Sequence, residues 1–168
     1  MGQRLTVDIL EDGERIGLIY YHWSAYFDST IWELKRLKDY IVKAKKEEKD
    51  ILLSIIDGIE SSGGGVGVTP ENREAAKKMY PDREFKEDIN RNYGLIYLDE
   101  KEIDRVYEMT EGIASIDIDA EEVINEVNLE FDTYFDFNSF PIDPFDVMTF
   151  DQLEEVFNYI METERKKE

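Results

Sequence analysis

The sequence predicts an α+β fold, and three observations indicate it. A pair of strands joined by a tight turn opens the chain, helical segments with clear capping signals follow, and strands and helices are mixed in the second half. This order differs from the regular strand–helix alternation of parallel α/β proteins. We therefore expect one α+β domain over residues 1–168, with an N-terminal β-hairpin, an antiparallel sheet packed with several helices, and a C-terminal helix.

Alternating side chains predict the N-terminal hairpin. In the segment 4–10 apolar and polar residues alternate, which is typical of a strand with one buried face. The segment 15–23 is the expected partner strand, and Asp12-Gly13 between the two is a dipeptide typical of tight hairpin turns. Further strands are expected at 94–98, 113–119 and 128–138.

Capping residues predict where the helices begin. Thr30 with Glu33 fits a capping box, and the helix expected there runs to about residue 49 with many Lys and Arg residues on its exposed sides. The apolar segment 51–59 is expected to be a second helix. Other helix starts are predicted at Thr69-Pro70, at Asp99, and at Thr149 with Gln152.

A glycine-rich segment, 61–67, follows the second predicted helix. A phosphate-binding P-loop needs a Lys and a hydroxyl residue directly after its glycines, whereas here Gly67 is followed by Val68, Thr69 and Pro70. A dinucleotide fingerprint also needs a preceding strand. The segment is therefore predicted to be a flexible loop that binds no nucleotide.

The charge is large, negative and unevenly distributed. The chain carries 40 acidic and 20 basic residues, and residues 99–168 hold 22 of the acidic residues but only 5 of the basic ones. Direct binding to nucleic-acid phosphates needs a basic surface, so it is not expected. No apolar run approaches the length of a membrane span. The acidic part, from about residue 99, is expected to attract basic partners, although the surplus of carboxylates could also serve solubility alone.

The sequence gives little support for a metal site or for a catalytic nucleophile. The chain has no cysteine and one histidine, His22, so a transition-metal site would need His22 together with carboxylates gathered by the fold. Ser24 is too close to His22 along a strand to form a triad with it. We expect His22 to be a hydrogen-bonded structural residue, and we expect no catalytic residue, no metal and no cofactor.

The predicted strands in the acidic part place carboxylates in rows. Same-face residues of a strand are about 6.8 Å apart, so acids at alternate positions form a row of fixed spacing. One row follows 113–119 and lies opposite Ile116 and Ile118. The other follows 128–138 and lies opposite an apolar face that includes Phe131, Phe135 and Phe137. The expected partner-binding residues are Asp117, Asp119, Glu130, Asp132, Tyr134 and Asp136. An ordinary solvated sheet face would show the same pattern.

Three stretches of sequence are similar to a known group of proteins. They are Met1-Gly2-Gln3-Arg4, the motif Tyr20-Tyr21-His22-Trp23-Ser24-Ala25-Tyr26, and the segment from Phe85 to Ile96 that contains Ile89-Asn90-Arg91-Asn92-Tyr93-Gly94. Together they resemble small proteins encoded by phages and mobile elements of Firmicutes, over roughly the first 120 residues. No general activity is known for that group, so the resemblance implies no catalytic residue. In size, acidity and lack of cysteine the chain is similar in kind to anti-CRISPR proteins that block Cas9.

These observations lead to a functional expectation with two alternatives. We expect a non-enzymatic inhibitor in the cytoplasm of a bacterial host that presents its acidic surface to a basic nucleic-acid-handling protein, with a Cas9-type effector as the first candidate. One alternative is a small metal-dependent hydrolase centred on His22. The other is an acidic virion or assembly protein.

Overall fold

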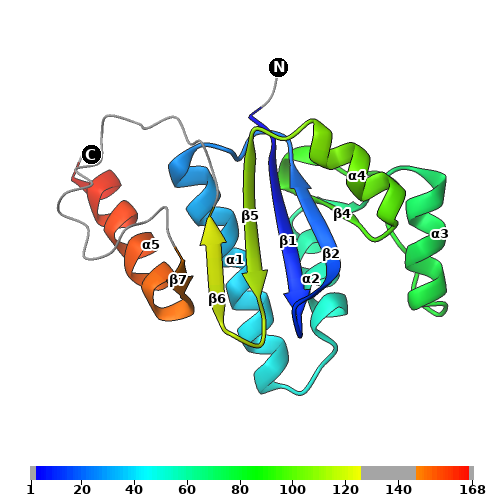
Figure 1. The fold of residues 1–168 in the computed structure, drawn as a ribbon, viewed down its shortest axis with the longest axis horizontal. Helices are drawn as coiled ribbons and strands as arrows, with labels where there is room; N and C mark the ends of the chain where they lie inside the picture. Colours follow the sequence, from blue (N-terminus) through cyan, green and yellow to red (C-terminus); the bar gives the residue numbers. More distant parts are fainter. Residues whose placement is uncertain (1–2, 126–146, 167–168) are drawn as a thin grey trace.

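The computed structural model describes residues 3–125 and 147–166 of the chain (Figure 1). Within these residues, one mixed sheet has the strand order β3-β4-β2-β1-β5-β6-β7. The strands are β1 (Leu5–Glu11), β2 (Glu14–Tyr21), β3 (Gly65–Val66), β4 (Leu95–Tyr97), β5 (Gly112–Asp117), β6 (Glu122–Asn125) and β7 (Met148–Thr149). The helices are α1 (Phe27–Lys46), α2 (Ile51–Ser61), α3 (Pro70–Met79), α4 (Glu100–Glu108) and α5 (Phe150–Arg165), and a short 3₁₀ helix, η1 (Arg91–Tyr93), precedes β4. The predicted α+β class, N-terminal hairpin and C-terminal helix are confirmed.

The hairpin of β1 and β2 turns at the predicted dipeptide. Asp12 and Gly13 have φ angles of +52° and +76°, which is the left-handed conformation that this type of two-residue hairpin turn requires. The strands pair antiparallel from Leu5 opposite Tyr21 to Glu11 opposite Glu14. The hairpin is therefore confirmed, but two features of it were not predicted. The register shifts between Ile9 and Leu10, and the first five residues of β1 are all buried, so both faces of this strand are covered rather than one.

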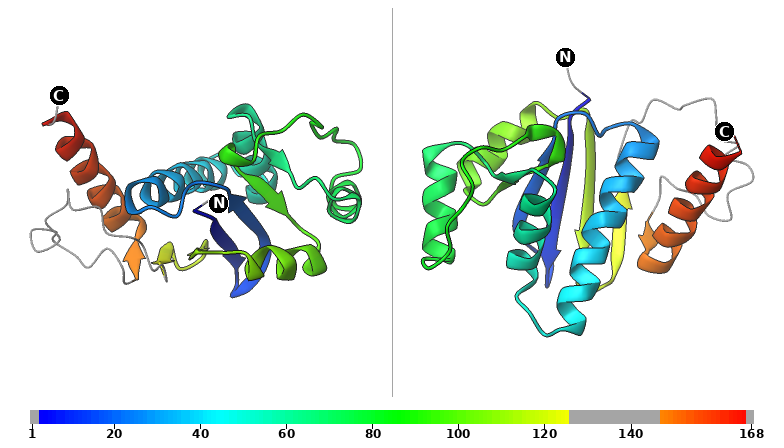
Figure 2. Two further views of the ribbon diagram at one scale, coloured as in Figure 1. Left: turned by 90° about the horizontal axis from the view of Figure 1, so that it is seen from above. Right: turned by 180° about the vertical axis from the view of Figure 1, so that it is seen from behind.

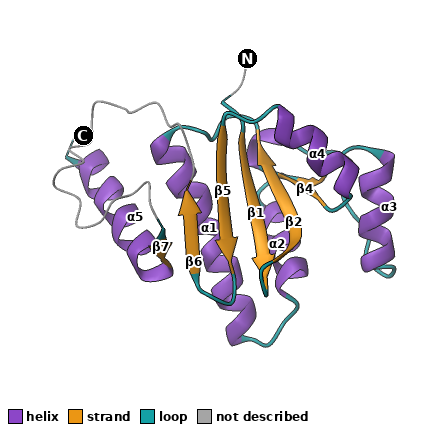
Figure 3. Cartoon of the chain, in the orientation of Figure 1, coloured by secondary structure: helices purple, strands orange, loops and turns teal. Residues whose placement is uncertain are grey.

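The sheet is mixed, whereas an antiparallel sheet was expected. β5 pairs with β1 in parallel, and β3 pairs with β4 in parallel, while the other neighbouring pairs are antiparallel. The arrows of β1 and β5 point the same way in Figure 3. The expectation was wrong on this point because β5 enters the sheet beside β1 only after the chain has passed through α1 to α4. Strand direction then depends on long-range packing that no local sequence signal reveals.

Helices lie on both faces of the sheet (Figure 2), and an apolar layer lies on each face. On its inner face, side chains such as Leu5, Val7 and Ile116 pack with apolar residues of α1, α2 and α5. On its outer face, residues of β2 and β4 pack against Ile103 and Val106 of α4. In Figure 1 the outer face of β6, β5 and β1 is turned toward the viewer, with α1 and α2 behind the sheet.

Three predicted helix starts are confirmed and one is wrong. Thr69, Asp99 and Thr149 are the N-caps of α3, α4 and α5, and Thr149 forms a full capping box with Gln152. Thr30 caps no helix, because α1 begins four residues earlier than expected, at Phe27. The Thr30 hydroxyl is buried and donates instead to the carbonyl of Ser24, 2.6 Å away, so it ties the first turn of α1 to the end of the β2–α1 connection.

The glycine-rich segment contains the buried strand β3 and the residues on either side of it. The prediction of a flexible loop was therefore wrong. Residues 64–67 are buried, and Gly65–Val66 pairs with β4. A Cβ atom on Gly64 would lie 2.2 Å from the carbonyl oxygen of Gly94, and one on Gly65 would lie 2.5 Å from Ile89. The glycines are therefore explained by close backbone packing rather than by flexibility.

Two further predicted helices are confirmed, and one predicted strand falls in the part of the chain that is not described. The helix α2 and the apolar face of α5 are confirmed, and Leu153, Val156 and Ile160 of that face are buried. The strand predicted at 128–138 lies outside the described residues. None of the helices in the described ranges combines the length and apolar character that crossing a bilayer requires.

Candidate partner-binding surface

Two of the predicted partner-binding residues lie where β5 ends. Asp117 is the last residue of β5 and is half-buried, whereas Asp119 is exposed in the turn between β5 and β6. Ile116 and Ile118 are buried on the opposite side, as the alternation predicts. The remaining four predicted residues, Glu130, Asp132, Tyr134 and Asp136, lie outside the described residues.

Both described acids take part in turn hydrogen bonds. The carboxylate of Asp117 accepts hydrogen bonds from the backbone N–H groups of Asp119, at 3.2 Å, and of Ala120, at 3.3 Å. The carboxylate of Asp119 accepts a hydrogen bond from the backbone N–H of Asp12, at 2.6 Å. These bonds position the acids before any partner arrives, and the second bond joins the β5–β6 turn to the β1–β2 turn.

The sequence analysis missed β6, which lies beside β5 on the side away from β1. β6 (Glu122–Asn125) pairs antiparallel with β5 and places Glu122 directly opposite Asp117. The signal was present but short, because Val123 and Asn125 are buried while their neighbours Glu122 and Ile124 are half-buried. A strand of four residues gives too little alternation to be distinguished from a loop by pattern alone.

Acidic residues are concentrated at the end of the sheet where these two turns meet. We call this region the acidic turn end. Three pairs of like charge lie within it: Glu11 opposite Glu14 across the hairpin, Asp117 opposite Glu122 across the next strand pair, and Asp12 beside Asp119 between the turns. Like charges directly opposite each other on neighbouring strands are destabilising, so this arrangement is held against electrostatic repulsion.

The contact between Asp12 and Asp119 changes how both groups titrate. A hydrogen bond with the Asp119 carboxylate, together with its negative charge, raises the pKa of Asp12. The pKa of Asp119 is lowered, because it accepts hydrogen bonds from both the side chain and the backbone of Asp12. Lys45 of α1 stands nearby, and its ammonium group pairs with Glu121 at 2.7 Å. The acidic turn end therefore has a fixed geometry and a strongly negative potential.

The outer face next to the acidic turn end is open in the described structure. α4 covers β2 and β4 on this face, and no other described element covers β5 and β6 there (Figure 1). Ile113, Ser115 and Ile124 on these strands are only half-buried. A partner could thus contact apolar and acidic side chains on one surface.

His22 lies just beyond β2 and supports the structural interpretation better than a metal site. Its Nδ1 atom is 2.7 Å from the hydroxyl oxygen of Tyr20, and the Trp23 ring packs edge-on against it with the centroids 5.0 Å apart. Within residues 3–125 and 147–166, no three His, Asp or Glu side chains are gathered closely enough to hold a metal ion.

A buried carboxyl group in α1 escaped the sequence analysis. Glu33, expected as part of a capping box, lies in the second turn of α1 with its side chain only 15% exposed. Burial raises its pKa to about 7, although Arg36 and hydrogen bonds with Tyr21 and Ser24 favour the ionised form. It lies between α1 and β2, so we assign it a structural role rather than a catalytic one.

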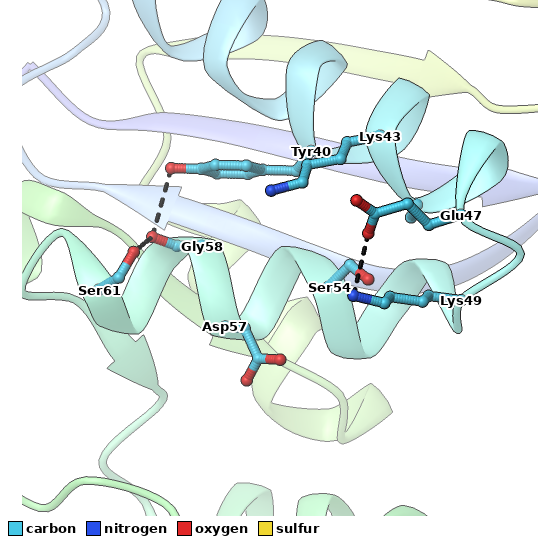
Figure 4. Close-up of a pocket in the computed structure, with 9 residues that line it drawn as sticks. Tyr40, Lys43, Glu47, Lys49, Ser54, Asp57, Gly58 and Ser61 are labelled. Carbon is cyan, nitrogen blue, oxygen red and sulfur yellow. Dashed lines mark hydrogen bonds and ion pairs between the residues drawn. The ribbon is translucent and has the colours of Figure 1, made fainter.

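A groove of about 340 Å³ runs between α1 and α2 (Figure 4). Its walls carry both signs of charge, including Lys43, Glu47 and Asp57, and the ammonium of Lys49 pairs with Glu47 at 2.9 Å. The Tyr40 hydroxyl donates to the carbonyl of Gly58 at 3.2 Å, so its ring lies across one end of the groove. This mixture of charges favours no particular ligand class.

Known proteins offer no guide to the use of these surfaces. No family model, no curated protein and no solved structure matches the chain.

Proposed function

We propose that the protein is a non-enzymatic binding protein that presents the acidic turn end and the adjoining open face to a basic surface of a partner protein. The observation that supports this most directly is the set of three like-charge pairs. A protein under selection for stability alone would separate these carboxylates or alternate them with Lys and Arg. A partner that supplies positive charge would relieve the repulsion on binding.

The geometry favours a protein partner over a metal ion. The acids of this surface are spread over two turns and two strands, and several of their oxygen atoms already accept backbone hydrogen bonds. Because the turns hold the carboxylates in place, little side-chain order has to be imposed on contact. The half-buried Ile113 and Ile124 beside them would add apolar contact area, which a hydrated cation does not use.

A nucleic-acid-binding channel is the kind of basic surface that fits this description. Such channels hold phosphate groups with clustered Lys and Arg, and an acidic protein surface of fixed spacing would compete for them. The resemblance of the first 120 residues to phage-encoded proteins directs the first test to a Cas9-type effector.

The test is the binding of purified Cas9 to the wild type and to two charge variants. In the variant Asp117→Asn/Glu122→Lys, the first substitution removes a negative charge but keeps a side-chain oxygen that can accept the hydrogen bonds of the turn. The second substitution replaces a negative charge with a positive one. The matched control, Glu74→Gln/Glu84→Lys, makes the same change in net charge at exposed acids near α3. We expect wild-type affinity to fall between about 50 and 200 mM salt, because screening shortens the reach of exposed charges.

The two variants separate a specific surface from simple net charge. We expect the first variant to lose about tenfold or more in affinity and the control to lose severalfold less. Equal losses in both variants would contradict the assignment to the acidic turn end. A wild-type protein that neither binds Cas9 nor inhibits its cleavage of DNA would contradict the choice of partner.

A further inference from the structure

A wide, open surface depression of about 590 Å³, which we call the cavity, lies at the other end of β2 from the acidic turn end. It is lined by His22, Gly63 and residues 88–93, which include η1. Glu14 begins β2 and His22 follows its last residue, so the cavity lies about 25 Å from the hairpin turn. This exceeds two screening lengths at 0.1 M salt, and the acidic turn end therefore affects the cavity only weakly.

We propose that this cavity is a binding site for a phosphate group, either free or as a phosphomonoester. Three side chains of its wall supply hydrogen-bond donors of the kind that phosphate binding uses: the guanidinium of Arg91, the imidazole of His22 and the amide of Asn92. This site is separate from the proposed partner-binding surface in residues, position and charge.

Arg91 is the cation available to such a ligand. No carboxylate of the described residues lies within ion-pair distance of its guanidinium, whereas nearby Arg4 is already paired with Glu111 at 3.3 Å. Planar guanidinium groups bind phosphate oxygens in a bidentate manner.

His22 is oriented for the same role. The hydrogen bond between Nδ1 and the Tyr20 hydroxyl fixes the ring and leaves Nε2 as its second polar atom. Tyr20 can accept from Nδ1–H, so the doubly protonated imidazole, which has two donors, is compatible with this arrangement.

The loop that carries Arg91 is held in place before a ligand binds. The Arg91 carbonyl accepts from the backbone N–H of His22 at 3.3 Å, and the Gly63 carbonyl accepts from Asn90 at 2.9 Å. The Asn90 side chain accepts from the backbone N–H of Asn92, also at 2.9 Å. These bonds join β2, the end of α2 and η1 around one cavity, so binding would cost little conformational order.

Asp88, on the cavity rim, carries the opposite charge and provides a sharp test. Because a carboxylate beside the site repels an anion, Asp88→Asn is expected to tighten phosphate binding severalfold. Arg91→Gln is expected to weaken it about tenfold, since a charge-assisted hydrogen bond is lost. The matched control is Arg105→Gln, an exposed arginine of α4 whose partner, Glu102, belongs to the same helix.

The experiment follows the Hε1 proton resonance of His22, the only histidine, during titration with inorganic phosphate at constant pH and at an ionic strength held constant with NaCl. We expect a saturable shift with a dissociation constant of about 1 mM or below, unchanged in Arg105→Gln. A parallel titration with adenosine monophosphate distinguishes the sources, because a phosphomonoester site binds it more tightly than free phosphate and a free-phosphate site does not.

Two results would overturn the proposal. One is a His22 resonance that moves no more with phosphate than with an equal ionic strength of NaCl. The other is an identical phosphate-induced shift in the wild type and in folded Arg91→Gln, with folding checked by the dispersion of the amide spectrum. Neither result depends on Cas9 or on the acidic turn end.

Discussion

The backbone N–H of Asp12 donates to the carboxylate of Asp119, 2.6 Å away, although the two residues are 107 positions apart in the chain. This hydrogen bond joins the turn of the N-terminal hairpin to the turn between β5 and β6. The Asp119 carboxylate raises the pKa of Asp12 through a hydrogen bond and its negative charge, whereas the hydrogen bonds that Asp119 accepts from Asp12 lower the pKa of Asp119.

Replacing Asp119 should lower the pKa of Asp12 toward that of an ordinary aspartate, because Asp119 is the main cause of its rise. In Asp119→Asn the neighbouring negative charge is absent, so we expect the pKa of Asp12 to fall relative to the wild type. Carboxyl-carbon NMR over an acid titration measures both groups. An unchanged Asp12 titration in this variant would show that the two side chains do not interact in solution.

The cross-strand pair of Asp117 and Glu122 predicts a gain of stability on charge reversal. Glu122→Lys replaces a like-charge pair with an opposite-charge pair, so we expect the free energy of unfolding to rise by about 0.5–1 kcal/mol at low salt. Glu122→Gln should give a smaller gain. Urea denaturation at two salt concentrations measures both variants, and a loss of stability in Glu122→Lys would contradict the repulsion that we infer.

The buried carboxyl of Glu33 predicts a pH dependence of stability. Its pKa is about 7 in the folded protein, compared with 4.5 for an ordinary glutamate. Above pH 7 the folded protein holds a buried charge, whereas below about pH 4.5 the group is protonated in both states. The free energy of unfolding should therefore decrease by up to about 3 kcal/mol as the pH rises from 4.5 to above 7.

Glu33→Gln tests this assignment. The amide cannot ionise, so we expect a weaker pH dependence and a higher free energy of unfolding than in the wild type at pH 8. Glu155→Gln, at an exposed position of α5, is the control and should keep the wild-type profile. Denaturation across this pH range decides the matter, and identical profiles for the wild type and Glu33→Gln would exclude a raised pKa.

Two glycines should respond differently to alanine. A Cβ atom on Gly64 would lie 2.2 Å from the backbone carbonyl oxygen of Gly94 and 2.8 Å from that of Tyr93, and backbone atoms cannot move aside as a side chain can. We expect Gly64→Ala to lower the free energy of unfolding by about 3 kcal/mol or more. A Cβ atom on Gly13 would have no other atom within 4 Å. Gly13→Ala therefore only places alanine in the left-handed conformation, which we expect to lower the free energy of unfolding by about 1 kcal/mol. Thermal denaturation compares them, and equal losses would contradict tight packing at Gly64.

The contrast between Thr149 and Thr30 shows what the sequence can predict. In the sequence, each of these residues is followed three positions later by a Glu or Gln of the type that a capping box requires. In the structure only Thr149 forms the capping box. At Thr30 the tertiary structure prevails, since its hydroxyl bonds to Ser24 and its partner Glu33 is buried against β2. Local patterns thus predicted the type of most elements, and long-range packing determined the start of α1.

The candidate site was harder to predict than the fold for the same reason. Asp117 could be placed on an outward face from its alternation with Ile116 and Ile118. That Asp119 would meet Asp12, and that β6 would set Glu122 beside Asp117, depends on pairings between distant segments. The glycines at 64 and 65 were misread because close backbone packing and flexibility select the same residue type.

The described sheet ends in strands of only two residues at both edges, β3 and β7. An extended peptide that adds itself to a sheet needs a long row of unpaired backbone groups, and neither edge offers one. Edge-to-edge joining of copies, which is the first step of many aggregation processes, is disfavoured for the same reason. A protein that binds the described part of this sheet is therefore expected to contact side chains, on a face or at the turns, rather than an exposed row of backbone groups.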